Sequence, residues 1–164
     1  MVEVLIAGIL LASALAAVSR ISVAALSGSA NLSNRAGIEA AINDNIQAMQ
    51  KEDSYFTDQW IIENGGQAAL EKACSDPSQD SNPDSEDPFS GPPPNALKNH
   101  LKLIVPEPRS TSIKTSIKRT FDIHSVPGIL RIIYSFEGPE EQVKTEQRII
   151  EMTPNFAAKC YNTQ

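Results

Sequence analysis

The chain begins with an apolar run over residues 1–26, MVEVLIAGILLASALAAVSRISVAAL, that contains one acid, Glu3, near its start. As a helix, residues 4–26 span roughly 35 Å, which is enough to cross a bilayer. A carboxylate close to hydrocarbon is unfavourable unless it is paired. The nearest cation is the α-amino group of Met1 or that of a neighbouring copy. The run therefore predicts a membrane helix that packs against other copies of itself.

The run lacks the pattern of a secretory signal, because it has no basic n-region and Ala24-Ala25-Leu26 is a poor cleavage site. Arg20 is its one charged residue after Glu3, and the long arginine side chain can reach the membrane interface from there. We therefore expect the helix to be retained without a leader.

The same helix is expected to continue well beyond the apolar run, because no proline occurs between residues 27 and 53. Its second half is amphipathic, with one apolar stripe formed by Ile38, Ile42, Ile46 and Met49. A single helix of about 50 residues would be roughly 75 Å long. The alternative is a break near Gly28, followed by a separate amphipathic helix.

The rest of the chain predicts a short helix over residues 67–74, an irregular proline- and aspartate-rich loop over residues 75–95, and then strands. Alternating apolar residues place strands at 101–105, 117–126, 130–136 and 143–152, with Lys144, Glu146 and Arg148 on the solvent face of the last. The expected fold is α+β: a long N-terminal helix packed, through its stripe, on an antiparallel sheet of about four strands. The expected segments are 1–27, 28–58, 59–100 and 101–164.

Cys74 and Cys160 are the only cysteines, and no Cys/His cluster accompanies them. An exported chain meets an oxidising compartment, so we expect them to form a disulfide, the alternative being two buried thiols. The net charge of −6 and an aromatic content of 5% argue against a nucleic-acid-binding protein. His100 and His124, expected on the surface of strands, form no catalytic constellation, and neither an enzyme nor a cofactor is predicted.

The order of these elements, and the motif MVEVLIA over residues 1–7, resemble the type IV pilin family. Glu3 stands two positions earlier than the family's glutamate, and the family's usual proline in the apolar segment is absent. The resemblance implies cleavage of a leader by a prepilin peptidase, methylation of the new N-terminus and an inner-membrane pool. It also implies stacking by a pilus assembly machinery into an extracellular helical filament of identical subunits. Glu3 would there neutralise the N-terminal amine, at Met1 in this sequence.

Other interpretations stay open at this stage. Glu3 could be an interfacial acid at the membrane edge. Arg20 could lie at the interface or pair with Glu39 or Asp44 of a neighbouring subunit. The chain could also be a pseudopilin of a type II secretion system, a minor pilin, or a monomeric binding ectodomain on a membrane tether.

Overall fold

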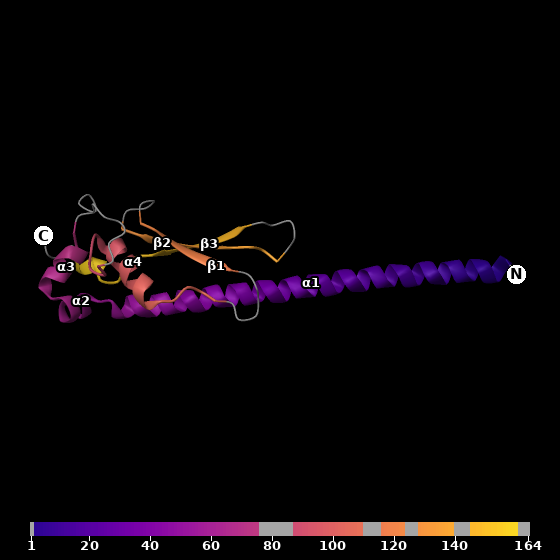
Figure 1. The fold of residues 1–164 in the computed structure, drawn as a ribbon, viewed down its shortest axis with the longest axis horizontal. Helices are drawn as coiled ribbons and strands as arrows, with labels where there is room; N and C mark the ends of the chain where they lie inside the picture. Colours follow the sequence, from indigo (N-terminus) through magenta and orange to yellow (C-terminus); the bar gives the residue numbers. More distant parts are fainter. Residues whose placement is uncertain (1, 76–86, 110–115, 124–127, 140–144, 161–164) are drawn as a thin grey trace.

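The computed structural model describes residues 2–75, 87–109, 116–123, 128–139 and 145–160, and for residues 3–5 the backbone alone. Helix α1 runs without a break from Val2 to Tyr55 and carries a head on its C-terminal half (Figure 1). This confirms the expected α+β layout, a long N-terminal helix with an antiparallel sheet. The alternative of a break is wrong, because Gly28 lies within regular helix.

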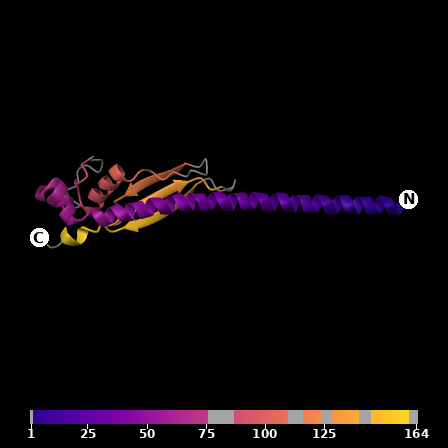
Figure 2. The ribbon, with the colours of Figure 1, turned by 90° about the horizontal axis from the view of Figure 1, so that it is seen from below.

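Three antiparallel strands form the sheet in the described part of the chain: β1 (Ile117–Asp122), β2 (Leu130–Phe136) and β3 (Glu146–Met152), with β2 in the centre. Alternate side chains of β2 are buried, as they are in a sheet with one face on the core. In the view of Figure 2 the strands emerge on both sides of α1, so the helix crosses the middle of the sheet.

The strand expected over residues 101–105 is wrong, because helix α4 (Pro93–Ile104) occupies this segment. Its prolines lie in the first turn, where no intrahelical N–H is needed. The eight successive residues from Pro94 to Leu101 are all buried, so about two turns of α4 are covered on every side. The short alternation of Leu101 and Leu103 was misleading, since Leu103 is 65% exposed. Helix α4 also begins inside the expected loop, of which residues 76–86 lie outside the described residues.

The expected solvent face of the last strand is wrong in part: Arg148 is exposed as expected, but with Glu146 it lies on the face that meets α1. The register places Glu146 opposite Phe136 and Arg148 opposite Tyr134, both of which are buried. Cross-strand partners share one face of a sheet, so Glu146 and Arg148 lie on the face that packs against α1. Ile149 points to the other face and is 47% exposed. Lys144 lies outside the described residues.

Two short helices follow α1. Thr57 caps α2 (Asp58–Gly65), its Oγ1 accepting a hydrogen bond from the Trp60 amide at 3.2 Å. Gly66, with a φ of 79°, separates α2 from α3 (Gln67–Ala73), the short helix that the sequence predicted.

A disulfide joins Cys74, directly after α3, to Cys160 at the end of α5 (Ala157–Cys160). The alternative of two free thiols is therefore wrong. The bond ties the helices that follow α1 to the C-terminal segment, across a sequence separation of 86. A cross-link over so long a loop restrains the unfolded chain by an amount on the order of 4 kcal/mol in the chain-entropy account.

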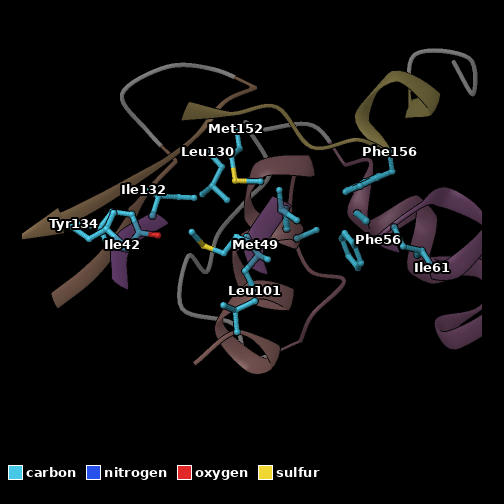
Figure 3. Close-up of a cluster of buried hydrophobic side chains, with 14 of the residues drawn as sticks. Ile42, Met49, Phe56, Ile61, Leu101, Leu130, Ile132, Tyr134, Met152 and Phe156 are labelled. Carbon is cyan, nitrogen blue, oxygen red and sulfur yellow. The ribbon is translucent and has the colours of Figure 1, made fainter. Parts of the chain in front are cut away.

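One hydrophobic core lies between α1, α4 and the sheet and continues to the end of α1. In Figure 3, Met49 of α1 lies among Leu101, Leu130 and Met152, and Phe56 lies near Ile61 and Phe156. Of the predicted helix stripe, Ile38, Ile42 and Met49 are fully buried and Ile46 is partly buried.

His100 was expected on a strand surface, but it is only 3% exposed and lies in α4. Its ring stacks on Phe56 with centroids 4.2 Å apart and meets the edge of Trp60 at 5.1 Å. Burial lowers the pKa of His100 below its usual value, while the negative charge of Glu52 acts in the opposite direction. The imidazole is therefore neutral at pH 7 and packs as an aromatic ring. His124 lies outside the described residues.

The buried, neutral His100 predicts a loss of stability at mildly acidic pH. Because its pKa in the folded chain lies below the value of about 6.5 in an unfolded chain, the unfolded chain takes up this proton first. The free energy of unfolding should fall as the pH drops below about 6.5 and stop falling below the folded pKa. His100→Phe keeps the stacking and should remove this component.

Urea unfolding of the full chain in detergent micelles, followed by the fluorescence of its single tryptophan, measures this effect. The comparison is made at about pH 7.5 and about pH 5.5, either side of the ordinary histidine pKa. His124 is present in both proteins and cancels. A difference between wild type and His100→Phe that is the same at both pH values would contradict the assignment.

Candidate assembly surface on α1

The N-terminal half of α1 projects from the head, and the described part of the chain leaves it uncovered (Figure 1). Every residue from Ile6 to Ala30 is exposed, and large apolar side chains such as Leu10 and Ile21 are 64% and 69% exposed. Contiguous apolar surface of this size is covered by lipid or by protein in soluble and membrane proteins alike. By length and composition, α1 is the one described helix that could cross a membrane.

The charged groups expected on this half are Glu3, the amine of Met1 and Arg20. Glu3 lies in α1, but its side chain and all of Met1 fall outside the described residues. Arg20 is exposed among apolar neighbours and forms no ion pair within the described part of the chain. A cation in this setting needs either water, lipid headgroups or an acid from another chain.

Two ion pairs fasten α1 to β3 where the helix enters the head. The Arg35 guanidinium donates two hydrogen bonds to the Glu146 carboxylate, from Nη2 to Oε1 at 2.6 Å and from Nη1 to Oε2 at 3.1 Å. Arg148 Nη2 lies 3.4 Å from Glu39 Oε2. Each pair is partly exposed, so its net contribution is modest, about 1 kcal/mol or less. Glu39, one of the two acids considered for Arg20, is thus already paired within its own chain.

A buried polar cluster behind these ion pairs joins α1, α4, β1 and β2. Asn45 of α1 donates from Nδ2 to the Pro106 carbonyl at 2.8 Å. Its Oδ1 accepts hydrogen bonds from Arg119 Nη1 and from the Tyr134 hydroxyl, each at 3.0 Å. Arg119 also donates from Nη2 to the Val105 carbonyl at 2.7 Å. Asn45 and Arg119 therefore hold the helix, the sheet and the end of α4 in one arrangement.

The positive charge of Arg119 is favourable at this position, next to the C-terminus of α4. Val105 and Pro106 follow the C-terminus of α4, where free carbonyls and the helix dipole favour a cation such as Arg119. Burial lowers the pKa of Arg119, while Tyr134 and Glu107 raise it, and arginine stays protonated. Burial raises the pKa of Tyr134 to about 12, so its hydroxyl is neutral and donates.

Sequence reasoning missed this cluster. Asn45 follows Ile42 by three residues and precedes Met49 by four, so helical spacing placed it on the buried stripe. Arg119 shares the parity of Ile117 and Phe121 on its strand, which placed it on the inner face. Polar residues at two buried positions were the available signal for a hydrogen-bonded pair.

An open groove of about 460 Å³ lies beside the cluster, between α1 and the segment that follows α4. Its walls are Ala41, Asp44, Asn45 and Ala48 on α1 and Val105, Pro106, Glu107, Pro108 and Arg109 on the other side. The described residues contain no group of three or more His, Cys, Asp or Glu side chains placed to hold a metal ion.

No family model, no curated protein and no solved structure matches this chain.

Replacing Arg119 tests the role of the polar cluster. Arg119→Leu leaves the Val105 carbonyl and Asn45 Oδ1 with fewer donors, and should lower the free energy of unfolding by about 2–4 kcal/mol. Lys118→Leu, at the neighbouring exposed position, is the matched control and should change it by less than about 0.5 kcal/mol. Urea unfolding in detergent micelles gives both values, and equal effects of the two substitutions would refute this role.

Proposed function

We propose that this chain is the structural subunit of a type IV pilus-like filament and that it polymerises through the N-terminal half of α1. Before assembly, the same half would hold the subunit in the inner membrane. The observation that supports this most is the division of one unbroken helix into an uncovered apolar half and a half built into the core. The head would then form the outer surface of an extracellular filament.

The continuity of α1 supports an assembly role over that of a simple tether. A tether needs only a hydrophobic segment, and a flexible connection would serve. Here Ile38, Ile42 and Met49 bury the second half of the same helix, and Asn45 links it to Arg119. The uncovered half therefore keeps a fixed direction relative to the head, which identical subunits need if they are to repeat along an axis.

In such a filament, apolar halves of α1 would cover one another, and packing between them would supply most of the assembly free energy. Glu3 would set the register, because an unpaired carboxylate in that apolar core is strongly unfavourable. The N-terminal amine of a neighbouring subunit is a suitable partner. By the resemblance, a prepilin peptidase and a pilus assembly machinery would act on the chain, and the filament would serve adhesion, motility or DNA uptake.

Glu3→Ala and Glu3→Gln test the proposal. Both should leave the head folded and reduce filament yield at least about tenfold, since 1.4 kcal/mol of lost pairing per contact already gives a factor of ten. Glu137→Ala, an exposed acid of the head, is the control and should assemble normally. Fibres sheared from cells are counted by electron microscopy and probed with an antibody to the head.

One result would overturn the proposal, and a second would overturn the role of Glu3 alone. A wild-type chain that forms no fibres and stays a membrane monomer would indicate a tethered ectodomain. Normal fibre yield from Glu3→Ala would remove the proposed role of the acid while leaving the filament itself in place.

A further inference from the structure

The groove beside Asn45 has the properties of a docking surface for an apolar helix that carries a positive charge. Its apolar walls are Ala41 and Ala48 on α1 and Val105, Pro106 and Pro108 opposite. These two alanines lie two helical turns apart on α1, and small residues on one face let another backbone come close. Figure 1 shows the chain leaving α4 and passing along α1. This segment after α4 forms the second wall of the groove.

The groove also has an excess of negative charge. Asp44 and Glu107 line it, against one cation, Arg109. Asp44 is exposed and forms no ion pair within the described residues. It lies on the same stretch of α1 as the two alanines, so it is an available partner for a cation held against this wall.

The uncovered half of α1 is complementary to this groove. It is apolar, and its one charge among the described side chains is Arg20. The residues four and three positions before Arg20 and four positions after it are Ala16, Ala17 and Ala24. On a helix these are the neighbours of Arg20 on one face. The remaining neighbour, three positions after Arg20, is Val23, which is 65% exposed, so the face is apolar, mostly small and carries a single cation at its centre.

We propose that the groove binds the N-terminal half of α1 from a second copy of the chain, with Arg20 of that copy paired with Asp44. This rests on the proposed filament. Glu39 is the less suitable partner because Arg148 already neutralises it within the chain. Glu107 acts electrostatically on the buried Arg119 and shares the segment of Arg109.

The pairing fixes a distance between subunits. Arg20 and Asp44 are 24 positions apart on α1, so two parallel copies joined by them are offset by roughly 36 Å along the helix axis. A contact between Glu3 and the N-terminal amine of another copy requires that the two copies be displaced along the helix axis by no more than the length of a side chain. The two contacts therefore join each subunit to two different neighbours. Together they fix the axial position of a neighbour at a short offset and of another at the longer offset.

Charge exchange tests the pairing in the full chain. Arg20→Glu and Asp44→Arg should each lower fibre yield at least about tenfold, because like charges opposed in an interface cost several kcal/mol. The double variant Arg20→Glu with Asp44→Arg should recover most of the yield. Arg20→Glu with Glu71→Arg, whose new cation lies on the exposed side of α3, is the control and should not recover it.

Cysteine pairs provide a second measurement that does not depend on yield. Fibres of Arg20→Cys with Asp44→Cys should form chain-to-chain disulfides, seen as a ladder on a non-reducing gel. Arg20→Cys with Gln50→Cys should not, since Gln50 lies about 9 Å farther along α1 and on another face. The native Cys74–Cys160 disulfide, which closes within one chain, reports that the head has folded.

The outcomes separate the two proposals. Wild-type fibre yield from Arg20→Glu, a double variant no better than the single ones, or no ladder from the Arg20–Asp44 cysteine pair would each overturn the groove contact. In all three cases, fibres that still depend on Glu3 would leave the proposed function standing. Absence of any wild-type fibre would overturn both.

Discussion

The structure depends on one constraint: the single helix α1 has an apolar half that projects from the head and a second half that is packed into the head. From Ile6 to Ala30 every residue of α1 is exposed and most are apolar, whereas Ile38, Ile42 and Met49 are fully buried in the head. A helix without a break transmits direction from one half to the other. Whatever covers the first half is therefore positioned by the packing of the second.

The head is built so that it holds this direction. The core covers the side of α1 that faces the sheet. The Asn45–Arg119–Tyr134 cluster adds hydrogen bonds, and these require a specific geometry, which hydrophobic contacts do not. Farther along, Phe56 and His100 stack at the end of α1, and the Cys74–Cys160 disulfide closes that end of the head. These contacts lie at successive levels along the helix, so tilting α1 would disrupt all of them.

Much of the fold could be predicted because its signals are long and periodic. The helix stripe and the alternation of β2 each repeat often enough to identify a buried face. The 101–105 segment was too short for that, and the first-turn prolines of α4 looked like loop residues. Glu146 and Arg148 were assigned to solvent because they are charged, whereas the register with β2 places them on the face toward α1 and the ion pairs join them to Arg35 and Glu39. Such long-range pairs leave no local pattern.

The candidate surface was partly visible in the same way. An apolar helix with Arg20 as its isolated cation can be recognised from sequence, whereas the groove that holds Asp44 arises from the meeting of α1 with residues 105–109. These segments are distant in the chain, and their contact follows from the folding of α4. Asn45 and Arg119, which hold that contact in place, are likewise joined only in three dimensions.

A helical reconstruction of fibres sheared from cells that express this chain tests the central claim most directly. The account predicts fibres whose core is made of residues 6–26 of α1 from many copies, with each head on the outside and attached to its own helix through residues 35–55. Fibres with α1 on the outer surface would contradict it. So would a chain recovered only as a membrane-bound monomer.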